Sequence, residues 1–436
     1  MTTHFKLREE WTSAFDICPP EVKETYARLQ ISVGDRVATR VLDDASRSVR
    51  NHILVSLYPL AEWLASSWWR LRWEPRASNP SAQKELNYRM SHELLAAGGG
   101  FVWPNLVFES DGVQMDIRVS ASATDSIPIQ YLESFQASIS GQEFESEIDA
   151  FMDRVLSRLR TLEIGDSELQ SLWSEVQEER RDAALSQFRR LEAELGFDPD
   201  EGPRDAIEKI INLSGTIGES SADEIATSLA LDNDPKESLR HIEEAAKTEG
   251  VRGRIEFNQE SKPDAVPQDA TSPGLGWPSA QAFRRKLGVS HGPIDSKFLA
   301  NLLGISDKEL LEGERSTSPI GLAVRQQNRL DVSLHFRKKS PVARRFEAAR
   351  FLADAQHAPI TDLWLPISDT KTARQKQQRA FAVEFLCPFE DLMATLAGDF
   401  SSEAMEDAAA YFDLSPLAIE SHLANHGVIE FSRERY

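Results

Sequence analysis

Two stretches near the C-terminus decide how this chain is interpreted. Residues 343–354 read ARRFEAARFLAD and residues 377–388 read QQRAFAVEFLCP. Pro341 precedes the first stretch and Pro388 closes the second, and proline is tolerated at the first turn of a helix but not in its interior. Together the two stretches keep the hydrophobic frame of a helix pair between Pro341 and Pro388.

The first stretch resembles the helix that carries the HExxH motif in the ImmA/IrrE family of metallopeptidases, and the second resembles the helix that carries that family's third zinc ligand. The resemblance places the two histidine ligands at Arg350 and Asp354, the catalytic glutamate at Phe351 and the third ligand at Gln377. These chemical positions changed, whereas the hydrophobic frame was kept at Phe346, Ala349, Phe381, Ala382, Leu386 and Pro388.

The replacements remove the chemistry of a zinc peptidase. Zinc binds neutral imidazole nitrogens and carboxylates, and a neighbouring glutamate takes a proton from the zinc-bound water. Arg350 stays protonated and offers only donors, and Phe351 has no proton chemistry. Asp354 remains a capable ligand and Gln377 a weak one. We expect no zinc or other cofactor, an inactive site, and an ion pair between Arg350 and Asp354 worth ~0.3 kcal/mol if exposed.

Composition describes a folded, acidic protein. The chain has 436 residues, a formal net charge of -21 and 41% hydrophobic residues, which suggests two or three domains with real cores. This charge argues against generic attraction to nucleic acid or anionic membranes. Only two cysteines, Cys18 and Cys387, are present, and the first residues lack the apolar run of a signal peptide. We therefore expect a cytoplasmic protein with no membrane contact.

The N-terminal part, residues 1–141, is expected to be a mixed α+β domain. Residues 56–73 contain leucines at helical spacing and four tryptophans, which predicts a buried core helix in preference to a surface for stacking nucleobases. Ser110, Asp111 and Gly112 separate two alternating runs within residues 101–120, which predicts a β-hairpin. A further strand is expected within residues 127–139.

Three segments follow this domain. Residues 142–249 are expected to form an acidic helical region, since residues 141–247 hold 27 acidic and 12 basic side chains. Residues 250–278 are rich in Gly, Pro, Ser and Asp and are interpreted as a linker. Residues 279–436 are interpreted as an ImmA/IrrE-like, zincin-like domain with a hairpin over 320–336 and a helix-turn-helix-like unit over 404–429.

Several histidines are candidates for a relocated metal site. A site of Asp354, His357, Gln377 and His335 is conceivable, because His357 follows Asp354 by about one helical turn. Surface histidines without a ligand role are the preferred interpretation. His422 and His426, four residues apart in the terminal unit, are interpreted in the same way.

One stretch is locally basic. Its binding candidates are Arg337, Lys338, Lys339, Arg344 and Arg345. This cluster would suit nucleic acid together with the terminal helices, but the candidate recognition helix carries Glu420 and almost no Arg or Lys. Contact with the acidic middle of the chain or with an acidic partner is the alternative.

The resemblance implies a bacterial or phage protein from stress, mobile-element or defence systems. We expect a pseudo-peptidase that binds a protein partner as a regulatory or scaffold subunit without cutting it. Two alternatives remain: a metallopeptidase with replaced ligands that cleaves a regulator, and a DNA-binding transcriptional regulator or antitoxin.

Overall fold

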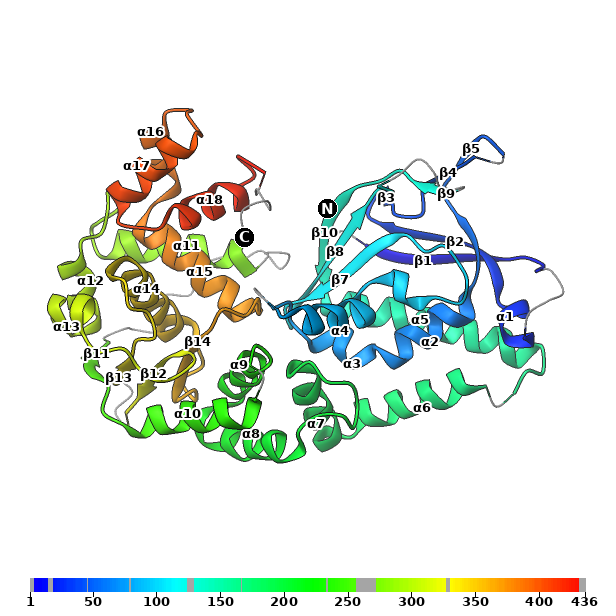
Figure 1. Cartoon of the computed structure of the whole chain (residues 1–436), viewed down its shortest axis with the longest axis horizontal. Coiled ribbons are helices and arrows are strands. Elements are labelled where there is room, and N and C mark those ends of the chain that lie inside the picture. The colour runs from blue at the N-terminus through cyan, green and yellow to red at the C-terminus, as the bar shows by residue number, and fades with distance from the viewer. Residues whose placement is uncertain are drawn as a thin grey trace. The chain divides into compact units, whose positions relative to one another are not determined.

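The computed structural model describes residues 4–14, 19–44, 46–77, 80–123, 129–165, 167–232, 234–255, 272–326 and 330–430. The chain forms two compact units, Met1–Pro203 and Arg204–Tyr436. Each unit combines helices with small antiparallel sheets, so the α+β class predicted from the sequence is confirmed (Figure 1).

Three small antiparallel sheets lie within the described residues of the first unit. The strands of the first sheet are β1 (Phe5–Trp11), β2 (Tyr26–Val33), β3 (Arg36–Val37) and β6 (Ile53–Ser56), of which β2 pairs with the other three. The second sheet runs in the order β10 (Phe135–Ser140), β8 (Gln114–Ser120) and β7 (Asn105–Ser110). The third runs β5 (Ser48–Arg50), β4 (Val41–Asp43) and β9 (Ile129–Tyr131).

Eight helices of this unit lie within the described residues. They are α1 (Pro20–Glu24), α2 (Leu57–Ser66), α3 (Trp68–Trp73), α4 (Ala82–His92), the 3₁₀ helix η1 (Leu94–Ala97), α5 (Gly141–Thr161), α6 (Glu168–Arg181) and α7 (Ala183–Glu194). The single helix expected over residues 56–73 is divided into α2 and α3 at Ser67. Trp63, Trp68 and Trp69 are buried, so the core interpretation of these tryptophans is confirmed.

The predicted hairpin of the first unit is confirmed. Strands β7 and β8 pair antiparallel with Ser110 opposite Met115, and the Asp111 carboxylate accepts hydrogen bonds from the N–H groups of Val113 and Gln114 in the turn. Alternate residues of β8 are buried, as its period of two requires. The single strand expected over residues 127–139 is instead two strands, β9 and β10, within the described part of that range.

The second unit is built on one antiparallel sheet in the order β11 (Val251–Arg254), β13 (Asp331–His335), β12 (Gly321–Arg325) and β14 (Trp364–Ile367). The predicted hairpin over residues 320–336 is therefore present as β12 and β13. The helices described in this unit are α8 (Arg204–Ile217), α9 (Glu219–Leu229), α10 (Pro235–Lys247), α11 (Ser272–Lys286), α12 (Ser296–Leu303), α13 (Asp307–Glu312), α14 (Pro341–His357), α15 (Ala373–Leu386), α16 (Phe389–Leu396), α17 (Ser402–Phe412) and α18 (Pro416–Asn425).

The segment boundaries differ from the expected ones. The acidic helical region is divided, with α5 to α7 in the first unit and α8 to α10 in the second. The expected linker over 250–278 holds strand β11 and the beginning of α11, and its residues 256–271 lie outside the described part. Gly253 counted toward the linker interpretation, but it lies within strand β11. It is packed so closely that a side chain there would collide with the Leu303 carbonyl. This glycine permits close packing of a strand and does not mark a loop.

The helices that bear on function lie in the second unit. Helix α14 begins after Ser340, whose hydroxyl caps the Ala343 N–H, and α15 begins after Thr372, which caps the Gln375 N–H. These two helices pack against each other, and α11 packs along α15. Gly276 allows that approach, because a Cβ at this position would meet the Gln377 carbonyl oxygen at 2.6 Å.

Candidate functional site

The positions that the resemblance singled out lie on the paired helices α14 and α15. Arg350, Phe351 and Asp354 on α14 are all buried, with exposed fractions of 4%, 0% and 2%. Phe351 packs edge-on against Phe336, with ring centroids 5.5 Å apart. Nothing at position 351 can transfer a proton, so a base at the site must come from another residue.

Asp354 pairs with Arg374, the second residue of α15. Arg374 Nε and Nη2 donate to the two oxygens of Asp354, each at 2.7 Å, which is the bidentate geometry of a strong guanidinium–carboxylate pair. Arg374 Nη1 donates to Asp362 at 2.8 Å and to the Ser220 hydroxyl at 3.1 Å. The two buried carboxylates raise the pKa of Arg374 against the opposing effect of its own burial. A fixed cation therefore lies between two buried acids.

The expected ion pair between Arg350 and Asp354 is wrong, because the Asp354 carboxylate is occupied by Arg374. Arg350 turns instead to neutral acceptors: the Ser368 carbonyl at 2.8 Å and the side-chain oxygens of Gln375 and Gln378. Burial, which removes water from the guanidinium, lowers the pKa of Arg350 to about 9. The side chain is thus still a cation at neutral pH, buried among amides.

Gln377, the expected third-ligand position, lines a small cavity of about 90 Å³ beside Asp354. The wall of this cavity comes from α9, α14, α15 and the turn after α14: Ser220, Ala353, Asp354, His357, Ala358, Pro359, Arg374, Gln377 and Gln378. The structure therefore brings Asp354 and Gln377 to one cavity, as the resemblance implies for two ligand positions. Arg374 shares that space with them.

His357 and His335 do not form a relocated metal site with these residues. His357 lines the cavity, but its Nδ1 donates to the Ala353 carbonyl at 2.7 Å and its Nε2 accepts from the Ser279 hydroxyl at 2.7 Å. Both nitrogens are therefore used. His335 is buried in β13 beside Ser333 and does not reach the cavity, so its expected surface position was wrong. Desolvation lowers the pKa of both histidines and favours their neutral forms.

The five basic binding candidates do not form one open surface. Arg344 and Arg345 are each 1% exposed and hold backbone carbonyls, Arg344 that of Leu310 and Arg345 that of Ile294. Burial lowers the pKa of both guanidinium groups.

The other three candidates lie closer to solvent. Arg337 and Lys338 are intermediate in exposure and both face Asp369, at 2.8 Å and 3.7 Å. Lys339 is exposed. The local excess of basic residues thus mostly stabilises the turns around α14, because arginine can bind several carbonyls at once.

Helix α9 adds residues to this site that the sequence did not reveal. The buried Glu224 carboxylate accepts hydrogen bonds from Thr372 at 2.9 Å and from Gln375 at 2.7 Å. Desolvation raises the pKa of Glu224 despite the nearby charge of Arg374. The acidic middle of the chain therefore does contact the helix pair, but through Arg374 and Gln375 and not through the five basic candidates. In the sequence, the one sign that Arg374 belongs to this site is its position three residues before Gln377, the expected third-ligand position.

Strand β14, the edge of the sheet beside the cavity, has its outward carbonyls occupied. The Trp364 carbonyl accepts from the Ser221 hydroxyl at 2.5 Å. The Pro366 carbonyl accepts from the side-chain amides of Gln375 at 3.0 Å and Gln378 at 3.2 Å. Proline also offers no N–H at position 366. These contacts occupy the carbonyls of Trp364 and Pro366, which an extended peptide added at this edge would use.

In comparisons with known proteins, no family model, no curated protein and no solved structure matches the chain. None of the helices in the described ranges has the length and apolar character needed to cross a membrane.

Proposed function

We propose that this chain is a catalytically inactive, ImmA/IrrE-like protein that binds a protein partner as a regulatory or scaffold subunit. The setting implied by the resemblance is a bacterial stress, mobile-element or phage-defence system. One observation carries the proposal: the Arg374 guanidinium is held between Asp354 and Asp362 at the helix pair where the resemblance implies a zinc ion.

A guanidinium supplies the positive charge of a metal ion without its chemistry. It neutralises the two buried carboxylates, but it has no open coordination position for a water molecule and cannot turn water into hydroxide at neutral pH. Phe351 provides no base. The site is therefore stable as it is and has no hydrolytic step to perform.

The occupied carbonyls of strand β14 also argue against peptide hydrolysis at this site, because a peptide substrate would need to bind there. With the carbonyls of Trp364 and Pro366 occupied by side chains of α9 and α15, a peptide added at this edge would lack both of those acceptors. We infer that a partner is bound at another surface.

Helix α4 and η1 offer such a surface in the first unit. Leu86 and Met90 stand four residues apart on α4 with exposed fractions of 52% and 56%, and Leu95 on η1 is 46% exposed. Residues four apart share one face of a helix, and exposed apolar groups that cluster mark interaction sites more often than isolated ones do. These three residues are our candidates for the partner contact.

The test uses the tagged full-length protein recovered from its host. The wild-type chain is expected to bring down a defined partner that remains uncut on prolonged incubation, whereas the Leu86→Asp, Met90→Asp double variant loses it. Leu185→Asp on α7, another exposed apolar residue, is the matched control and should retain the partner.

Two results would overturn the proposal. One is cleavage of the partner by the wild-type chain that disappears in the Asp354→Asn variant, which would make Asp354 part of a working peptidase. The other is recovery of duplex DNA with no protein partner, in a salt-dependent manner, which would support the DNA-binding alternative.

A further inference from the structure

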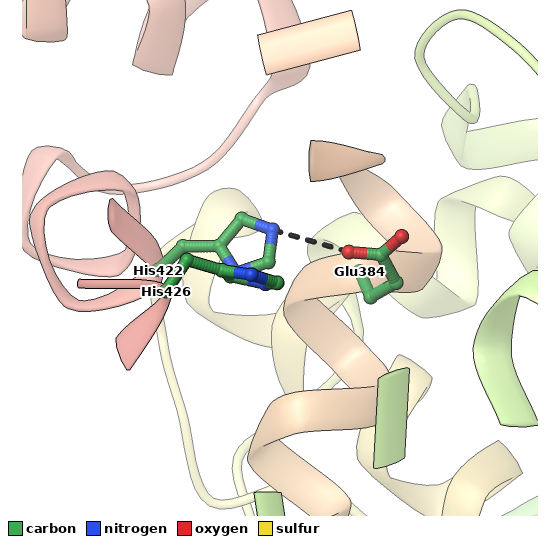
Figure 2. A group of neighbouring side chains, drawn as sticks. All are labelled: Glu384, His422 and His426. Atoms are coloured by element: carbon green, nitrogen blue, oxygen red, sulfur yellow. Dashed lines mark ion pairs between the residues drawn. The ribbon is translucent and has the colours of Figure 1, made fainter. Parts of the chain in front are cut away.

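A second polar cluster lies at the other end of α15. Glu384 is near the end of that helix, His422 is on α18, and His426 caps the C-terminal end of α18. One potential ligand atom from each residue lies within 4.8 Å of the other two. Figure 2 shows both imidazoles extending from α18 toward the Glu384 carboxylate. His422 is 0% exposed, so its expected surface position was wrong.

In the described part of the chain, the buried histidine nitrogens of this cluster lack hydrogen bonds, and His422 Nε2 meets Glu384 only in an ion-pair contact (Figure 2). Neither ring nitrogen of His422, nor Nε2 of His426, has a hydrogen bond within the described residues, although all three atoms are buried. Buried polar atoms are nearly always paired. His92, a buried histidine of the first unit, gives the usual pattern: its Nδ1 contacts the Phe108 carbonyl at 3.1 Å and its Nε2 contacts Glu74 at 3.0 Å.

The spacing of the cluster fits a metal ion better than a hydrogen bond. His422 Nε2 lies 3.3 Å from Glu384 Oε2, and the contact does not qualify as a hydrogen bond. Charge-assisted N–H to O bonds are about 2.7–2.9 Å long. Two ligands at about 2.0–2.1 Å from a tetrahedral zinc ion are about 3.3–3.4 Å apart. The separation of this one pair matches the edge of a zinc coordination tetrahedron, and the third ligand atom, from His426, lies within 4.8 Å of both.

Neighbouring groups fix the carboxylate and one ring in place. Gln281 donates to Glu384 Oε1 at 2.8 Å, and the Phe389 N–H donates to Glu384 Oε2 at 3.2 Å. The His426 ring is stacked against both Phe389 and Trp277, with centroid distances of 3.7 Å and 4.0 Å. Such supporting contacts orient the ligands of metal sites before the ion arrives.

We propose that Glu384, His422 and His426 bind a divalent transition-metal ion, with Zn²⁺ as the best match. Two imidazoles and one carboxylate are a ligand set that zinc accepts, and soft thiolates are not required. Three protein ligands leave the fourth position of the ion to a water molecule, and because His422 and Glu384 are fully buried, the ion would tie α15 to α18. This proposal departs from the expectation of a chain without cofactors, and it does not depend on the proposed function.

The experiment uses the full-length protein, stripped of metal with a chelator and titrated with Zn²⁺. We expect one equivalent of zinc to remain after desalting, and tetrahedral Co²⁺ to give an intense visible absorption band. His422→Ala, His426→Ala and Glu384→Gln should each lose the stoichiometric ion. Gln281→Ala should keep the site with roughly 10–100-fold weaker affinity, since it removes only a supporting contact.

The half-buried position of His426 makes His426→Ala the variant to rely on if His422→Ala does not fold. His241→Ala, at an exposed histidine of α10, is the control for adventitious binding and should bind zinc as the wild type does. Absence of a stoichiometric ion in the wild type, or a zinc equivalent that persists in folded His426→Ala, would overturn the proposal. Neither result bears on whether a partner is bound uncut, so the two proposals fail separately.

Discussion

The two ends of helix α15 hold buried polar clusters that solve the same problem differently. At the first turn, Asp354 and Asp362 share the guanidinium of Arg374, so both carboxylates have a partner of opposite sign. Near the last turn, Glu384 faces two imidazoles whose buried nitrogens lack hydrogen bonds. A buried carboxylate needs a cation or several donors. The comparison teaches that the chain carries its own cation at one end and leaves the place of a cation to be filled at the other.

Removing the built-in cation is expected to have the largest effect. Arg374→Ala leaves Asp354 and Asp362 buried without a partner, and breaking a buried pair in this way costs about 3–5 kcal/mol of unfolding free energy. Denaturant unfolding of the full-length chain measures it. Arg240→Ala, at an exposed arginine of α10 with two glutamate neighbours, is the control and should leave the unfolding free energy close to that of the wild type. A similar, small loss of unfolding free energy in both variants would contradict the claim that Arg374 neutralises two buried carboxylates.

The second largest change in stability is expected from adding Zn²⁺ to the cluster of Glu384, His422 and His426. A ligand that binds only the folded state at 100 times its dissociation constant adds about 2.7 kcal/mol to the unfolding free energy. We expect Zn²⁺ to raise the melting temperature of the wild-type protein and of Asp354→Asn, but not that of His426→Ala. If Zn²⁺ raised the melting temperature of His426→Ala but not that of Asp354→Asn, zinc would bind at the Asp354 end of α15, contrary to the proposal.

Replacing the buried Arg350, near the first turn of α15, is expected to lower the unfolding free energy by a smaller amount. Arg350→Met keeps most of the volume but leaves the Ser368 carbonyl and the Gln378 side-chain oxygen without this donor. Leaving such groups unsatisfied costs about 1–3 kcal/mol each, partly offset by no longer burying a charge. We expect a net loss of about 2 kcal/mol in urea unfolding. A more stable variant would mean that burial of the guanidinium outweighs its hydrogen bonds.

Glu224 predicts a modest dependence on pH. Because burial raises its pKa, the folded state holds this proton more tightly than the unfolded state does. Unfolding free energy therefore falls as pH rises from the ordinary value of 4.5 through the raised value, by at most about 1.4 kcal/mol per pH unit. Glu224→Gln should remove this slope.

The matched control for that measurement is Glu237→Gln on α10. Arg240 lowers the pKa of the exposed Glu237 carboxyl, so its contribution to the pH slope has the opposite sign. Stability curves of the three proteins, extended well below the ordinary value of 4.5 to include the Glu237 titration, check both directions. Equal slopes in the wild type and Glu224→Gln would contradict the raised pKa.

The sequence was a good guide to local structure and a poor one to side-chain partners. Turn residues and periodicity predicted the hairpins at β7–β8 and β12–β13, because those signals are local, and the family resemblance predicted the helix pair α14–α15. Sequence spacing favoured Arg350 as the partner of Asp354. The real partner, Arg374, is on another helix and is brought there by the fold.

The missed cluster has the same explanation. His422 and His426 are four residues apart, which was visible, but Glu384 lies 38 positions before His422. Only the packing of α18 on α15 brings the three together, and only the structure shows that the histidine nitrogens are buried without hydrogen bonds. Likewise, the basic run around Arg344 and Arg345 suggested an open surface because sequence does not record that backbone carbonyls occupy both side chains.

Metal content of three full-length proteins tests the difference between the two ends of α15 most directly. The wild type, Asp354→Asn and His426→Ala would be loaded with Zn²⁺, desalted and measured by elemental analysis against protein concentration. The account predicts one zinc per chain in the wild type and in Asp354→Asn, and none in His426→Ala. A zinc ion that follows Asp354, and is indifferent to His426, would contradict it.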